Sequence, residues 1–259
     1  MLFQDRGRAE SFGADAGRYD RARPTYPAAM VDQVLAGFES GTPTAVLDVG
    51  CGTGIASRLF TDRGCQVLGV EPDERMAALA RAHGVTVEVG AFEAWEPAGR
   101  RFDLLISGQA WHWVDPEAGA LRAAEVLRSG GRIALFWNIG RPPDEVADEF
   151  EAVYRRRSEG LDQYSVLLGG GDAERFHQAL EGIRATGRFS EPAQRSVDWT
   201  RSYSRTEWLD QLPTHSDHMA LPPDRLGELL DEIGDVIDSF GGSFPMAYET
   251  ALITAQRIT

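Results

Sequence analysis

Residues Val46–Gly54 read VLDVGCGTG. A short apolar run reaches Asp48, glycines follow at positions 50, 52 and 54, and a stretch with helical spacing begins at Ile55. Glycine lets a backbone turn tightly and approach a ligand without a side-chain clash. A helix that starts after such a loop offers free N–H groups and the positive end of its dipole. The pattern predicts a strand, a glycine turn and a helix around a nucleotide-like ligand, although a plain strand-to-helix turn would look similar.

Apolar runs and helical patterns alternate on both sides of this segment. Alternation at this spacing predicts a parallel α/β sheet with helices on both faces. Beyond Asn138 the alternation weakens, and helices dominate. We expect a single domain over residues 1–259, with an N-terminal lid and helix (1–43), a cofactor-binding core (44–138), and a helical cap with the last strands (139–259). The expected strands are 44–48, 66–70, 85–89, 103–107, 132–137, 193–200 and 248–258, and the expected helices are 55–64, 73–83, 116–127, 144–158, 172–185 and 222–240.

Charge and composition exclude several classes of function. The chain has 259 residues, 26 basic and 40 acidic, for a formal net charge of −14. Phosphate contacts need a basic stripe, and Arg155–Arg157 is the one dense run, which more often solvates a helix face than binds an anion. We therefore expect no nucleic-acid partner. All basic residues are arginine, which excludes lysine-based catalysis. We expect no membrane contact, because no apolar run approaches ~18 residues. We expect a cytoplasmic location, because the N-terminus does not read as a secretory signal and the chain has two cysteines, Cys51 and Cys65, which suggests a reducing compartment. Their spacing does not suggest a metal site.

The spacing around the glycines favours one type of nucleotide over another. The dinucleotide fingerprint is G-x-G-x-x-G, but here the third glycine comes one position early. A carboxylate at Asp48 suits an amine-bearing ligand better than a diphosphate, which it would repel. Glu71 ends the next predicted strand, where a carboxylate can accept hydrogen bonds from both ribose hydroxyls. S-adenosylmethionine fits these features better than NAD.

Five segments resemble one known family in order and spacing: VLDVGCGTG, GVEPDERM, VEVGAFEAW, FDLLISGQAWHWVD and EVLRSGGRIALFW. They are similar to the class I S-adenosylmethionine-dependent methyltransferases, and more narrowly to the small-molecule group that includes trans-aconitate methyltransferase. A weaker match, YDRARPTYP at Tyr19–Pro27, looks like the family's lid. The resemblance implies a doubly wound, Rossmann-like, mostly parallel seven-stranded sheet with an inserted helical cap. It also implies methyl transfer from S-adenosylmethionine, with S-adenosylhomocysteine as product.

The resemblance places the cofactor on named positions of this chain. Asp48 and Gly50 are expected at the methionine amino group, with Gly52 in the same loop, and Glu71 on the ribose. The family's polar adenine contact is replaced here by Ala91, so adenine contacts fall to the Phe92 backbone or ring, or to Glu93. The remaining expected cofactor positions are Pro72, Met76, Ser107 and Gln109.

The segment SGQAWHW at Ser107–Trp113 follows the fourth strand, beyond which the ligand crevice of such sheets lies. His112 is the candidate catalytic residue, and three roles stay open: a general base, a polar group that positions the acceptor, or packing. Trp111 and Trp113 are expected in the core or in contact with the ligands. Tyr19 and Arg23 of the lid would contact a carboxylate or form surface pairs.

His215 is expected in the substrate pocket; its spacing from His218 also fits a metal, but no third ligand is in view, so we expect none. The leading prediction is methyl transfer to a small-molecule acceptor, with oxygen or carboxyl groups favoured, by a monomer or homodimer. The alternatives are a cofactor-binding regulator without turnover, an NAD-dependent oxidoreductase, and a methyltransferase acting on a protein.

Overall fold

The computed structural model describes residues 11–38, 43–157 and 172–258. Within them lies a seven-stranded sheet in the order β3-β2-β1-β4-β5-β7-β6. The five strands from β3 to β5 run parallel, while β7 is antiparallel to both of its neighbours. This confirms the predicted fold class. The strands are β1 (Ala45–Val49), β2 (Gln66–Glu71), β3 (Thr86–Val89), β4 (Phe102–Gly108), β5 (Leu127–Arg141), β6 (Ala193–Ser204) and β7 (Ser243–Gln256).

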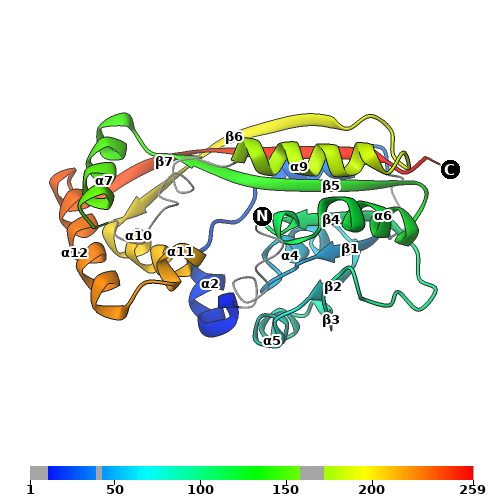
Figure 1. The fold of residues 1–259 in the computed structure, drawn as a ribbon, viewed down its shortest axis with the longest axis horizontal. Helices are drawn as coiled ribbons and strands as arrows, with labels where there is room; N and C mark the ends of the chain where they lie inside the picture. The colour runs from blue at the N-terminus through cyan, green and yellow to red at the C-terminus, as the bar shows by residue number, and fades with distance from the viewer. Residues whose placement is uncertain (1–10, 39–42, 158–171, 259) are drawn as a thin grey trace.

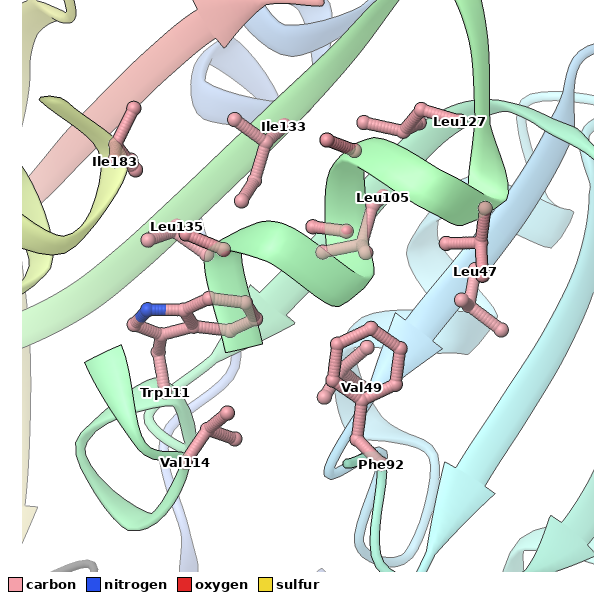
Figure 2. Packing of buried hydrophobic residues seen from close by; sticks show 14 of the residues in the cluster. Leu47, Val49, Phe92, Leu105, Trp111, Val114, Leu127, Ile133, Leu135 and Ile183 are labelled. Carbon is pink, nitrogen blue, oxygen red and sulfur yellow. The ribbon is translucent and has the colours of Figure 1, made fainter. Parts of the chain in front are cut away.

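Helices cover both faces of the sheet, because its central strands carry apolar side chains on both sides. On one face, α6 (Pro116–Val126) and α9 (Asp172–Ala185) pack over a cluster that includes Leu105, Ile133 and Leu135. Figure 2 shows this packing, with Trp111 and Phe92 at its lower edge. On the other face, α3 (Ala28–Leu35) and α4 (Ile55–Thr61) bury the opposite side of the same strands. One more helix, α5 (Glu74–Ala82), follows β2 and packs beside β3.

The last three strands are longer than the sequence predicts, and β5 is the clearest case. The predicted strand ends at Trp137, whereas β5 continues to Arg141 and pairs with β7 along this extension. The helix expected over 116–127 is α6, which ends at Val126, but Gly130 and Gly131, which the sequence suggests as its stop, lie inside β5. The extended strands carry the sheet beyond the nucleotide-type core, as Figure 1 shows along the top of the molecule.

Helices on these extended strand ends form a second core, which we call the cap. The cap consists of α7 (Asp144–Arg157), α10 (Arg205–Gln211), η4 (Leu212–Thr214), α11 (Ser216–Met219) and α12 (Pro223–Ser239). Phe150, Trp208 and Ile233 pack there against Phe244 and Tyr248 of β7. The residues Ser204–Glu207 have the sequence pattern of a capping box, and they start α10: Ser204 accepts from Glu207 N, and the Glu207 carboxylate binds Ser204 N. The inserted cap is therefore confirmed. The glycine run at 169–171, which the sequence predicts to be a turn, lies outside the described residues.

The basic run Arg155–Arg157 ends α7. Arg156 and Arg157 bind Glu232 of α12, and Arg157 also binds Glu228. The run thus joins two cap helices on their solvent side. This agrees with the expectation that it forms a solvated helix face.

The segment that we call the lid, residues 11–27, lies between the core and the cap. It contains η2 (Ser11–Asp15) and α2 (Ala16–Ala22). Arg18 and Arg21 both pair with Asp210 of α10, at 3.2 and 3.0 Å. Figure 1 shows α2 between the cap helices and the end of the core. Among the described residues, the structure contains no helix with both the length and the apolar character needed to cross a membrane.

Substitution of two helical glycines can test how closely the helices pack. A Cβ on Gly182 of α9 would lie 2.3 Å from the carbonyl oxygen of Pro116, whereas a Cβ on Gly227 of α12 would meet nothing within 4 Å. Gly182→Ala is expected to lower the free energy of unfolding by about 1–2 kcal/mol, since overpacking against backbone outweighs the gain in helix propensity. Gly227→Ala, the control, should raise it by about 0.5–1 kcal/mol. Urea unfolding measures both; a Gly182→Ala variant as stable as the wild type would contradict this packing.

Candidate active site

A cavity opens at the carboxyl ends of β1, β2 and β4, beneath the lid and the cap. This is the crevice in which open α/β sheets bind their ligands. The structure brings most of the predicted site residues together around it. The predicted residues that line the cavity are Tyr19, Arg23, Gly50, Gly52, Glu71, Pro72, Met76, Phe92, Glu93, Gln109, His112, Trp113 and His215.

The glycine loop folds back onto the end of β2. Gly50 N donates to the carbonyl oxygen of Val70 at 2.8 Å, and Cys51 N donates to the same oxygen at 3.3 Å. Gly50 has a φ of 68°, a left-handed conformation that favours glycine. A Cβ there would also lie 2.5 Å from Ala110 Cβ. The loop therefore needs glycine both for its conformation and for the closeness of the segment after β4.

The carboxylate of Glu71 fixes the loop from the other side. Its Oε2 accepts from Gly52 N at 2.9 Å, and its Oε1 accepts from Asp73 N at 3.0 Å. Each oxygen keeps acceptor capacity, since a carboxylate oxygen has two lone pairs. Burial raises the pKa of Glu71 to about 7, although the two backbone hydrogen bonds lower it in part. Glu71 is thus a preoriented acceptor at the cavity wall.

Asp48 faces a small side chamber of the same crevice, lined also by Gly50, Gly52 and Gln109. Its Oδ2 accepts from Ser57 Oγ at 2.6 Å, while its Oδ1 is buried and has no hydrogen-bond partner among the described residues. Burial raises the pKa of Asp48 to about 7, against the effect of the Ser57 hydrogen bonds. A buried, half-satisfied carboxylate is costly unless a donor or a cation completes it.

Two predicted site residues lie away from the cavity. Ser107 is fully buried and donates from Oγ to the carbonyl oxygen of Val49 at 2.8 Å, so its hydroxyl holds β4 to β1 instead of a ligand. Trp111 belongs to the hydrophobic core and packs near Val114 and Leu135 (Figure 2). The core position of Trp111 is one of the two alternatives expected for it, whereas the hydroxyl of Ser107 is engaged within the sheet and does not line the cavity.

Phe92 and Glu93, the two candidates for adenine contact, have other partners in the structure. The Phe92 ring is 3% exposed and packs into the core cluster, although the residue borders the cavity. The Glu93 carboxylate accepts from Asp115 N at 3.2 Å. These contacts leave the backbone at residue 92 as the simpler adenine contact, which stays a prediction.

Gln109 adopts a strained backbone conformation at the cavity wall. Its φ is 56°, which is unusual for a side chain with a Cβ. Its backbone N donates to the Phe136 carbonyl at 2.9 Å, and its side-chain amide donates to the Asn138 carbonyl at 3.0 Å. Such strain persists where surrounding bonds impose it, and it gathers at functional sites. Asn138 also donates to Thr25 O, so the same corner ties the lid to β5.

His112 lines the cavity from η3 (Trp111–Trp113). Its Nδ1 accepts a hydrogen bond from Trp137 Nε1 of β5 at 3.3 Å. Burial lowers the pKa of His112 well below its usual range, and the charge of Arg175 lowers it further. The imidazole is therefore neutral near pH 7.

The end of the cavity beneath the cap carries polar groups that the sequence analysis largely missed: Arg175, Gln211 and Tyr248 beside the predicted Arg23 and His215. Arg23 Nε, Gln211 Oε1 and His215 Nε2 are buried without a hydrogen-bond partner among the described residues. Burial, then the charge of Arg23, lowers the pKa of His215 well below its usual range. Buried polar atoms left unpaired at a cavity point to a polar ligand that completes them.

A buried chain of hydrogen bonds lies behind this end of the cavity. Asp217, which lines the cavity, accepts from His218 at 2.9 Å, and His218 Nε2 contacts Tyr154 OH at 2.8 Å. Burial would raise the pKa of Asp217, but its bonds to His218 outweigh this effect and lower it. His218 is thus engaged on both nitrogens. The part of the chain that the structure describes contains no group of three or more residues suited to hold a metal.

Comparisons with known proteins agree with this geometry. Residues 47–135 match the family described as a methyltransferase domain. Residues 47–135 therefore resemble a methyltransferase domain. An uncharacterised methyltransferase of Mycobacterium tuberculosis is 36% identical over 165 residues, which cover 57% of this chain and 66% of that protein. The matched region thus spans just under two thirds of that relative's length.

Two further proteins match the methyltransferase domain or its fold. The trans-aconitate 2-methyltransferase of Mycolicibacterium gilvum is 33% identical over 118 residues, 44% of each chain. A solved structure from Anaeromyxobacter dehalogenans, described as a candidate type II methyltransferase, superposes with a TM-score of 0.63 at 24% identity, covering 91% of this chain and 98% of that one. The resemblance drawn from the sequence motifs is confirmed.

The raised pKa values of Asp48 and Glu71 predict how stability depends on pH. Unfolded carboxyl groups titrate near pH 4, so between about pH 4 and 7 the folded protein holds protons that the unfolded chain has released. The free energy of unfolding therefore falls as pH rises through this window. In the ligand-free protein, Glu71→Gln should lose less stability between about pH 5 and pH 8 than the wild type, as measured by urea unfolding.

Glu74→Gln is the control, because Glu74 is exposed in the first turn of α5, close to Glu71 in sequence, and pairs with Arg81. Its stability curve should run parallel to that of the wild type. Parallel curves for all three proteins would show that Glu71 is ionised in the folded state at both pH values.

Proposed function

We propose that this protein transfers the methyl group of S-adenosylmethionine to a small acidic acceptor, at an oxygen of a carboxylate. The observation that supports the proposal most is the distribution of charge along the cavity. Glu71 and Asp48 stand at the end near the glycine loop, whereas Arg175 stands beneath the cap, and Arg23 of the lid borders both the cavity and the side chamber of Asp48. A cationic nucleoside fits the first end, and an anion fits the second.

The residues present fit the cofactor. The unpartnered Asp48 Oδ1 suits an ammonium group, and the held carboxylate of Glu71 suits two ribose hydroxyls. Pro72 and Met76 supply an apolar wall beside Glu71. When bound, S-adenosylmethionine supplies an activated methyl group, because the sulfur leaves as a neutral thioether. What the protein adds is alignment and exclusion of water, for which the lid and the cap are placed.

The acceptor end supports a small anion. Arg175 lies close enough to His112 and His215 to lower the pKa of both. Arg23 binds the Thr214 carbonyl through one terminal nitrogen at 2.6 Å, which leaves its buried Nε for a ligand. Guanidinium groups pair well with carboxylates. The trans-aconitate methyltransferase among the relatives is named for a small carboxylate, and we extend that acceptor class to this chain.

The alternatives weighed above have less support. An NAD-dependent oxidoreductase would need its diphosphate beside the buried Asp48, which would repel it. A regulator without turnover would not need the polar cap end, whose unpartnered atoms suit a second ligand next to the cofactor.

Turnover tests the proposal directly. The protein is mixed with S-adenosylmethionine and a panel of trans-aconitate, citrate, malonate and simple phenols, and release of S-adenosylhomocysteine is measured. We expect release with at least one of the carboxylic acids and none with NAD in place of the cofactor. Tight cofactor binding without release for any acceptor would support the regulator instead.

Glu71→Ala tests the cofactor end. The variant should bind S-adenosylmethionine more weakly by ~1.5–3 kcal/mol, the scale of hydrogen bonds to a charged group, and calorimetry measures this. Glu74 is exposed in the first turn of α5, so the control variant Glu74→Ala should bind as the wild type does. Equal affinities of Glu71→Ala and the wild type for S-adenosylmethionine would show that Glu71 does not bind the ribose.

Arg175→Gln tests the acceptor end. KM for the acid that turns over should rise about tenfold, since one charge-assisted contact is lost, while the affinity for S-adenosylmethionine stays the same. Arg184→Gln on the same helix is the control, because Arg184 pairs with the exposed Glu181 and Glu191. An unchanged KM in Arg175→Gln would argue against an anionic acceptor at this end.

A further inference from the structure

The hydrogen bond between Trp137 and His112 determines where the imidazole can carry its proton. An indole nitrogen is a donor and never an acceptor. Trp137 Nε1 lies 3.3 Å from His112 Nδ1, so Nδ1 must be the unprotonated nitrogen. Trp137 is 1% exposed and packs edge-on against Phe176, with ring centroids 5.1 Å apart, so its indole is held in place.

The single proton of the neutral ring is therefore on Nε2. Burial of His112 and the charge of Arg175 both disfavour a second proton. Because Nδ1 is occupied by Trp137, Nε2 is the nitrogen left to act in the cavity that His112 lines. In this tautomer Nε2 donates a hydrogen bond into the cavity, and it has no lone pair with which to take a proton from the acceptor.

We propose that His112 holds the acceptor by donating a hydrogen bond from Nε2–H, and that Trp137 is the positioning residue that fixes this tautomer. The inference rests on the proposed function and narrows its acceptor class. A site without a base at this position methylates an acceptor that arrives already ionised. Carboxylates meet this condition at neutral pH, whereas alcohols and most phenols do not.

The transfer step balances without a proton. One carboxylate oxygen accepts the hydrogen bond from His112, and the other forms the new O–C bond to the methyl group as the S–C bond breaks. The bonding electron pair goes to sulfur. The negative charge of the acceptor and the positive charge of the sulfonium disappear together, which yields an ester and a thioether, and His112 ends the step as it began.

The competing role of general base would need the other tautomer. With the proton on Nδ1, two N–H groups, those of His112 and Trp137, would face each other across 3.3 Å in a buried site. The cost of leaving a buried donor unpaired corresponds to a preference of about 5-fold to 150-fold for the donor tautomer. Asp217 and His215 also line the cavity near the cap, but they belong to other elements, and Asp217 is engaged by His218.

The tautomer can be measured without any turnover. In the full chain labelled with ¹⁵N-histidine, the two ring nitrogens of His112 are assigned by comparison with His112→Gln. We expect Nε2 to show the shift and couplings of a protonated nitrogen, and Nδ1 those of an acceptor, with and without S-adenosylhomocysteine. A protonated Nδ1, or a doubly protonated ring near pH 7, would overturn the inference.

Three variants of His112 separate donor from base. A glutamine amide reaches the place of Nε2 and can donate there, an asparagine amide reaches only the place of Nδ1, and alanine reaches neither. With the carboxylic acid that turns over in the panel, His112→Gln should keep turnover within about tenfold of the wild type. His112→Asn and His112→Ala should both fall further and raise KM for the acid. Equal loss in all three variants would identify a base and contradict the proposal.

Trp137→Phe tests the positioning residue. The indole donor is lost, so the Nδ1–H tautomer of His112 should become populated in the ¹⁵N spectrum, while thermal unfolding and cofactor affinity show whether the core is intact. An unchanged His112 tautomer in a folded Trp137→Phe variant would show that Trp137 does not fix it. Absence of turnover with every acid would contradict the proposed function. The ¹⁵N measurement of the His112 tautomer does not depend on turnover, so the two results can be distinguished.

Discussion

The contact between the glycine loop and the end of β2 is the constraint on which the site depends. Two backbone N–H groups of the loop share the Val70 carbonyl, and a third, from Gly52, binds the carboxylate of Glu71. Glu71 also binds the backbone that begins α5. One buried side chain thus joins the first two strand ends and sets the spacing of the crevice between them. If the loop moved away, the carboxylates of Glu71 and Asp48 would lose the orientation that makes them receptors for a cationic nucleoside.

The cavity combines two surfaces with different origins. The inner surface belongs to the sheet and is built from residues close in sequence, between β1 and β5. The outer surface comes from the lid and from the cap at the far ends of β5, β6 and β7 (Figure 1). Ion pairs between α2 and Asp210 join lid and cap, so the two parts that close over the acceptor are also attached to each other. The chain as a whole is acidic at −14, so the arginines beneath the cap are a local exception to the net charge.

The sequence predicted the core well and the cap end poorly, for physical reasons. Local signals such as a glycine turn, a capping box or an apolar run specify nearby structure, and the strand ends of a parallel sheet converge by geometry. Arg175 and Gln211 showed no such signal, because their meeting depends on how distant helices pack. Trp137 looked like any apolar strand residue, yet its indole determines the state of His112. Ser107 lies next to cavity residues in the sequence, but its hydroxyl bonds within the sheet, a contact that no local pattern indicates.

A crystal structure of the protein with S-adenosylhomocysteine tests the central claim most directly. We expect the ligand to lie along the glycine loop, with both ribose hydroxyls on the Glu71 carboxylate, the amino group toward the side chamber of Asp48, and the sulfur facing the wall that contains His112. Adenosine density elsewhere on the molecule, or a ribose that leaves Glu71 bound only to Gly52 and Asp73, would contradict it.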